Sequence, residues 1–200
     1  MKLQDRLPYS IKVNGRSYSV DLDFRNVLSM LDVMARTDLL PEARDYLALK
    51  CVMWHPHGDL RAIMTALREL LFPAADATHR HNQKLTDFVQ DADLIRAAFY
   101  QSYGINLWRD NLHWMEFTSL LAGLPEGSRY SEILGIRARP MPKPTKYNAE
   151  ERQWLARAKA EHAVRLTDKE REDGLREGLR GVAMSLLALA DHGNGGESYG

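Results

Sequence analysis

The chain has 200 residues, of which 44% are hydrophobic and 27% are charged, so it can form one domain with an appendage or two small domains. Lys plus Arg and Asp plus Glu both number 27, and the resulting zero formal charge excludes a whole-protein field that would gather DNA or a membrane surface. The single cysteine excludes an intramolecular disulfide, and the sequence shows neither a signal peptide nor a membrane-spanning apolar run, so we expect a cytoplasmic protein.

The first predicted element is a β-hairpin over residues 10–20. Apolar and polar residues alternate on both sides of Asn14-Gly15, which supplies the two positive-φ positions of a tight turn. An isolated hairpin is marginal in water, so we expect it to pack against the helices or against the sheet edge of another copy.

Helices are predicted over most of the remaining chain, because apolar residues recur at helical spacing. The first five span about residues 23–36, 41–54, 60–71, 88–103 and 110–123, and a short sixth helix covers residues 128–134 and is closed by a glycine. The sequence therefore predicts a mostly α fold, a helical bundle with a short N-terminal β-hairpin and a C-terminal helical arm.

A domain boundary is predicted where the composition changes, after residue 137. Three prolines and four basic side chains make residues 137–146 extended and fairly stiff. We expect four parts: a helical domain over residues 1–138, a Pro/basic linker over 139–147, a charged helical arm over 148–190 and a disordered tail over 191–200.

Patterns for chemistry are weak throughout the chain. His55-x-His57 and His79-x-His81 each pair two imidazoles, but the third and fourth ligands of a zinc site are missing, and solvated loop histidines are the alternative interpretation. Asp87 and Asp91 share a helical face, which suits either an acid/base pair or carboxylates at a helix N-terminus. The sequence has no nucleophile motif and no phosphate-binding glycine loop, so we expect no enzyme, no cofactor and no metal.

Partner binding is the better-supported interpretation, and its candidate residues fall into three groups. The aromatics either lie in the centre of the bundle or leave one side for a partner. The basic residues after the bundle either contact phosphate or form a solvated connection, and an apolar stripe in the arm serves self-association or a client. The candidates are Trp108, Trp114 and Phe117; Arg137, Arg139, Lys143 and Lys146; and Leu175, Leu179, Val182 and Leu186.

Several segments of the chain, taken in order, form a recognisable set. They are Asp23-Phe24-Arg25, Gln90–Asp93, Ala98–Gln101, Tyr103–Leu107, Leu112-His113-Trp114, Phe117, Leu120-Leu121, Gly123-Leu124-Pro125, Ile133, Gly135 and Arg137. In these segments the chain resembles a tail-region protein family of long-tailed phages and prophages, whose gene lies between those of the major tail protein and the tape-measure protein, in the place of the tail-assembly chaperones. The resemblance covers about residues 10–160 and ends by about residue 165.

The resemblance implies a non-enzymatic role in the host cytoplasm. Such proteins are thought to coat the long helical tape-measure protein before the tail tube polymerises around it, and an all-helical domain with surplus apolar stripes suits a helical client. We therefore expect a tail-assembly chaperone that binds the tape-measure protein and other tail proteins, as a homo-oligomer. The alternatives are a structural tail or neck component of the particle and a nucleic-acid-binding regulator that uses the linker and arm.

Overall fold

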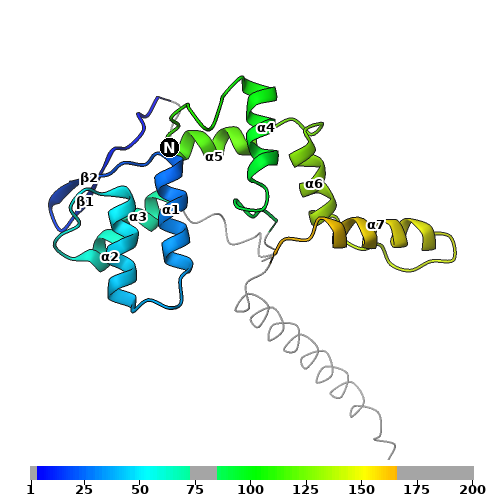
Figure 1. Ribbon diagram of the computed structural model, residues 1–200, viewed down its shortest axis with the longest axis horizontal. Helices are drawn as coiled ribbons and strands as arrows, with labels where there is room; N and C mark the ends of the chain where they lie inside the picture. Colours follow the sequence, from blue (N-terminus) through cyan, green and yellow to red (C-terminus); the bar gives the residue numbers. More distant parts are fainter. Residues whose placement is uncertain (1–3, 73–84, 166–200) are drawn as a thin grey trace, which may run out of the picture. The chain divides into compact units, whose positions relative to one another are not determined.

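The computed structural model describes residues 4–72 and 85–165 of the chain (Figure 1). These residues contain one antiparallel β-hairpin and seven helices, which confirms the predicted mostly α fold. The chain divides into two compact units, Met1–His162 and Ala163–Gly200, and all seven helices belong to the first. A search of the described helices finds none with the length and apolar character needed to cross a membrane.

The hairpin consists of β1 (Ser10–Val13) and β2 (Arg16–Ser19), in the register Ser10↔Ser19 to Val13↔Arg16. Its turn is the predicted one, because Asn14 and Gly15 both have positive φ, 49° and 77°. Ile11 and Tyr18, which are paired across the strands, are buried. The inner side of the hairpin thereby packs against α3.

Three helices complete the first half of the unit: α1 (Phe24–Ala35), α2 (Pro41–Val52) and α3 (Leu60–Leu71). The carboxylates of Asp23 and Asp59 accept hydrogen bonds from amides of the first turns of α1 and α3, which explains where these helices begin. α1 packs on α2 and α2 packs on α3, with fully buried residues at each contact (Figure 1). These include Val27, Leu49, Ile63 and Leu67.

Aromatic rings link this half to α4 (Ala92–Tyr103) and α5 (Trp114–Ala122). Phe117 of α5 lies between Phe24 of α1 and Phe99 of α4, with ring centroids 4.7 and 5.3 Å apart in stacked geometry. All three rings are buried. The core is therefore continuous from α1 through α5 to α4.

Three predicted helix boundaries differ from the observed ones. The fourth helix begins at Ala92 instead of residue 88, because the Asp87 carboxylate accepts from two following amides and holds residues 88–91 in a turn. The fifth begins at Trp114 instead of residue 110, because the preceding segment pairs with the segment before α1. The short sixth helix, α6 (Arg129–Ala138), continues through the predicted glycine stop at Gly135.

The segment after α6 leads into a further helix of the same compact unit. Residues 139–147 contain no helix, and α7 (Ala149–Glu161) packs on α6 within the unit Met1–His162. The side chain of Leu155 is buried, and Lys159 Nζ donates to the Arg137 carbonyl oxygen at 2.6 Å. The rest of the predicted arm from residue 166, and the tail over 191–200, lie outside the described residues.

Candidate protein-interaction surface

Trp108 is presented to solvent by a tightly bonded loop after α4. Gly104 closes the helix with φ of 70°. The Asn106 side chain accepts from the Trp108 amide at 3.1 Å, and the Asp110 carboxylate accepts from the Asn106 amide at 2.7 Å. Leu107 is buried beneath the loop, whereas Trp108 is 68% exposed. The loop therefore fixes the backbone of Trp108 and leaves its indole exposed.

Two adjacent pockets adjoin this indole, with volumes of about 200 and 370 Å³. Arg96, Leu107 and Trp108 line both of them. The Arg96 guanidinium carbon lies 5.0 Å from the centroid of the Trp108 ring, a cation–π geometry that holds the ring in place. Tyr100, one turn along α4 from Arg96, is also exposed and lines the larger pocket. We call Arg96, Tyr100, Leu107 and Trp108 the Trp108 surface.

The other two aromatic candidates lie in the core. Trp114 and Phe117 are both buried, and the Trp114 indole nitrogen donates to the Leu71 carbonyl oxygen at 3.3 Å. The Phe117 ring fills the space between α1 and α4, and the Trp114 ring stacks on it, so both rings occupy the bundle centre that was one of the two positions considered for them. Of the three aromatics, Trp108 alone is exposed.

Arg137, predicted as an exposed basic residue, is buried and paired with Asp91. Its guanidinium makes two bonds to the Asp91 carboxylate, at 2.7 and 2.8 Å, and donates to the carbonyl oxygens of Leu85 and His162 at 2.7 and 2.6 Å. The hydrogen bonds from Asp91 raise the pKa of Arg137, against the opposing effect of burial. Arg137 thus joins the segment before α4 to α6 and to the end of α7.

The same bonds decide how Asp87 and Asp91 are used. The Asp91 carboxylate accepts from Arg137 and from the Asp87 amide, and the Asp87 carboxylate accepts from the amides of Val89 and Gln90. These bonds support the structural interpretation at a helix start over an acid/base pair.

The remaining candidates are exposed or outside the described residues. Arg139, Lys143 and Lys146 are exposed between α6 and α7. The arm candidates Leu175, Leu179, Val182 and Leu186 lie outside the described residues, as do His79 and His81. His55 and His57 are exposed in the loop after α2. Within residues 4–72 and 85–165, no group of three or more His, Cys, Asp or Glu side chains is placed to hold a metal ion.

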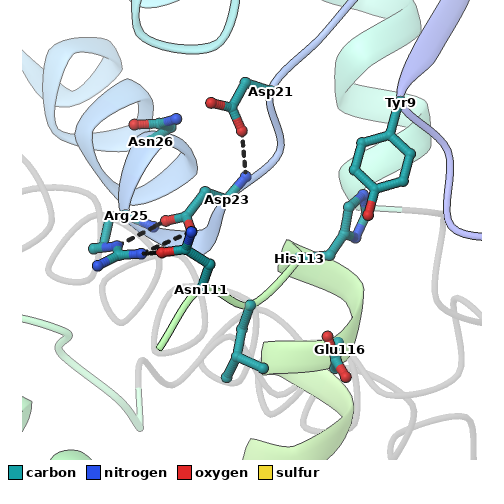
Figure 2. A pocket seen from close by; sticks show the side chains of 9 residues that line it. Tyr9, Asp21, Asp23, Arg25, Asn26, Asn111, His113 and Glu116 are labelled. Atoms are coloured by element: carbon teal, nitrogen blue, oxygen red, sulfur yellow. Dashed lines mark hydrogen bonds and ion pairs between the residues drawn. The ribbon is translucent and has the colours of Figure 1, made fainter. Parts of the chain in front are cut away.

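A polar pocket of about 510 Å³ lies where the starts of α1 and α5 meet (Figure 2). Asp23 and His113 form an antiparallel bridge flanked by two backbone hydrogen bonds, Phe24 N–H to Leu112 O at 2.9 Å and Trp114 N–H to Leu22 O at 2.7 Å. Each bridge residue also caps its helix, because its side chain accepts an amide hydrogen of the first turn. The bridge therefore fixes two helix starts against each other.

The hydrogen bonds of His113 assign a role to each ring nitrogen. Nδ1 accepts from the Met115 amide at 3.2 Å, and Nε2 lies 3.0 Å from the Pro8 carbonyl oxygen, which can only accept. Nε2 is therefore the donor of this pair. Tyr9 packs edge-on against this ring, with centroids 5.4 Å apart (Figure 2).

Asp23 and Arg25 form the second polar contact of the pocket. The Arg25 guanidinium donates to both Asp23 oxygens at 2.9 Å and also to the Asn111 side chain (Figure 2). Burial acts to raise the pKa of Asp23, but the bonds from the Arg25 side chain and backbone outweigh it and lower the pKa. The hydrogen bonds of Asp23, Arg25 and His113 thus hold the two helix starts together.

The outward face of α2 was missed by the sequence reasoning. Leu40, Leu47 and Trp54 are all exposed, the first at 75% and the last at 84%. α2 has little amphipathic contrast, because apolar residues lie on its buried face and on its exposed face. The available signal was the seven-residue spacing of these three residues, which repeats on one side of a helix.

Comparison with known proteins gives one family. The family model described as Bacteriophage Gp15 protein matches residues 3–164. No curated protein and no protein of solved structure shows a significant match.

Proposed function

The chain belongs to the bacteriophage Gp15 protein family, and we propose that it is a non-enzymatic tail-assembly chaperone that binds the tape-measure protein in the host cytoplasm. The supporting observation is the Trp108 surface, an exposed indole held between two pockets. Apolar side chains that follow each other at i, i+3 or i+4 on a client helix can enter such neighbouring pockets.

The binding free energy available from covering the Trp108 side chain suits a reversible contact. A tryptophan side chain buries about 150–250 Å² when fully covered, and at about 25 cal/mol per Å² the exposed two-thirds of this ring corresponds to roughly 3 kcal/mol. The Arg96 contact and the bonded loop hold the ring before a client arrives, which lowers the entropy lost on binding. A client helix can therefore be held during assembly and released afterwards.

Co-expression with the tape-measure protein of the same phage tests the proposal. We expect the tagged chain to keep the tape-measure protein soluble and to co-purify with it. Trp108→Ala should reduce the captured amount at least tenfold. Tyr147→Ala is the matched control, because it removes an even more exposed ring that lines neither of the two pockets. A tape-measure protein that stays insoluble and fails to co-purify with the wild-type chain would refute the proposal.

Mass spectrometry of purified particles separates the chaperone from the structural alternative. A chaperone is absent from finished particles, whereas many copies per particle would establish a tail or neck component. The regulator alternative loses one of its four basic side chains, because Arg137 is buried in an ion pair. Retention on heparin that falls steeply with salt, and that depends on Arg139, Lys143 and Lys146, would favour it.

A further inference from the structure

The outward face of α2 carries an apolar strip that no other described element covers. Its two ends are Leu40, before the first turn, and Trp54, just after the last. Tyr46 and Leu47, both exposed, lie in the middle. The opposite side of the helix, with Ala48, Leu49 and Val52, is buried against the rest of the unit. The strip is thus separate from the core and from the Trp108 surface.

Two opposite charges border this strip at equal sequence distances from Tyr46. Glu42 lies in the first turn of α2 and Lys50 in the last, and both are exposed. With Tyr46 they follow the spacing i, i+4, i+8, which places all three along one side of a helix. Lys50 donates to the Trp54 carbonyl oxygen at 3.2 Å. Within the part of the chain that the structure describes, neither Glu42 nor Lys50 forms an ion pair.

The strip is complementary to itself when it is read in the reverse direction. A two-fold axis between Tyr46 and Leu47 would bring Glu42 of each copy beside Lys50 of the other, and Leu40 beside Trp54. Tyr46 and Leu47 would meet at the centre. We propose that this face of α2 is a dimerisation seam, on which α2 of a second copy of this chain packs antiparallel.

Charge complementarity favours a second copy over an unrelated client. An isologous contact requires that one patch match itself under a two-fold rotation. Opposite charges at the two ends of an apolar centre satisfy that condition for antiparallel helices and oppose the parallel arrangement, which would place Glu42 beside Glu42 and Lys50 beside Lys50. The orientation of α2 in the dimer therefore follows from two charged residues.

The mass of the full-length chain in solution is the first test. Light scattering across a concentration series should give twice the chain mass of 22.9 kDa. Leu47→Glu should give the monomer mass with unchanged far-ultraviolet circular dichroism, because its side chain is exposed in the free chain. Trp108→Ala is the control and should leave the dimer intact. A monomeric wild-type chain, or a dimer that Leu47→Glu does not weaken, would overturn the proposal.

A charge exchange tests the antiparallel orientation. Glu42→Lys alone and Lys50→Glu alone should each raise the dimer dissociation constant at least tenfold, because each places like charges together at both ends of the seam. The double variant carrying both changes should return to within about threefold of the wild-type constant. If both single variants weaken the dimer and the double variant weakens it further, the antiparallel pairing is wrong.

Discussion

Replacing Arg137 by methionine probes the contact that joins three segments of the unit. The substitution keeps an unbranched apolar stem but removes the guanidinium, which binds both oxygens of Asp91 and the carbonyl oxygens of Leu85 and His162. The buried Asp91 carboxyl group would then lose its ion-pair partner. An uncompensated buried charge is among the few causes of large losses in stability.

The expected loss in the free energy of unfolding is large. Breaking a buried ion pair from one side costs about 3–5 kcal/mol. The two lost bonds to carbonyl oxygens add about 1 kcal/mol each where water does not replace them. We expect a total of roughly 5–7 kcal/mol, against the 5–15 kcal/mol that is typical of a whole domain.

Urea unfolding followed by circular dichroism measures this difference, with Arg129→Met as the matched control. Arg129 forms an exposed pair with Glu132 on the same helix, so its removal should cost less than about 1 kcal/mol. The double variant Asp91→Leu, Arg137→Met should be more stable than Arg137→Met alone, because it leaves no unpaired charge. A loss in the free energy of unfolding below 1 kcal/mol for Arg137→Met would refute the reasoning and indicate that Arg137 is an exposed linker residue.

Three further changes test the helix starts and one turn. Asp23→Asn keeps a capping side chain but removes the charge that Arg25 binds. Because the pKa of Asp23 is lower in the folded protein, this stabilisation is complete above the unfolded carboxyl pKa of about 4 and is lost as the pH falls through the folded pKa. The free energies of unfolding of the wild-type chain and of Asp23→Asn should therefore differ by up to about 1 kcal/mol at neutral pH and converge in acid. His113→Ala removes a cap and a bond to Pro8, at about 2 kcal/mol, whereas His113→Asn should recover about half in the same assay. Gly58→Ala should cost about 1–3 kcal/mol, because φ is +86° and the new Cβ would lie 2.9 Å from the Tyr18 hydroxyl oxygen. Gly127→Ala is the control and should be neutral, because its Cβ would meet nothing within 4 Å. Equal thermal midpoints for these two variants would contradict the clash.

The fold class could be predicted from the sequence because it depends on local signals. Asn14-Gly15 and Gly104 adopt positive φ readily, Pro41 fixes φ at the first position of a helix, and each of them marks an element boundary in the structure. Gly135 lies inside α6 instead, because a glycine is only a weak stop when the following residues are held by tertiary contacts, as Arg137 is.

The candidate surfaces were harder to predict, because exposure depends on residues that are distant in the sequence. Trp108 and Trp114 lie in the same short segment, yet the first is exposed and the second is buried against α3 and against Phe88 in the segment before α4. Arg137 has the composition of a basic linker, and its partner Asp91 lies 46 positions earlier. The seven-residue spacing of Leu40, Leu47 and Trp54 marks one side of the α2 region as apolar, but spacing alone does not distinguish an exposed side from a buried one.

The bridge between Asp23 and His113 has a consequence for synthesis on the ribosome. His113 binds the carbonyl oxygen of Pro8, 105 positions earlier in the chain. Phe24 stacks on Phe117, which is translated shortly after His113. At about 5–20 residues per second, roughly 5–20 s pass between the emergence of the hairpin and the arrival of its partners. Throughout that interval the Phe24 ring, which α5 will later cover, is exposed on the nascent chain. A ribosome stalled before residue 112 would therefore carry an incomplete, aggregation-prone core.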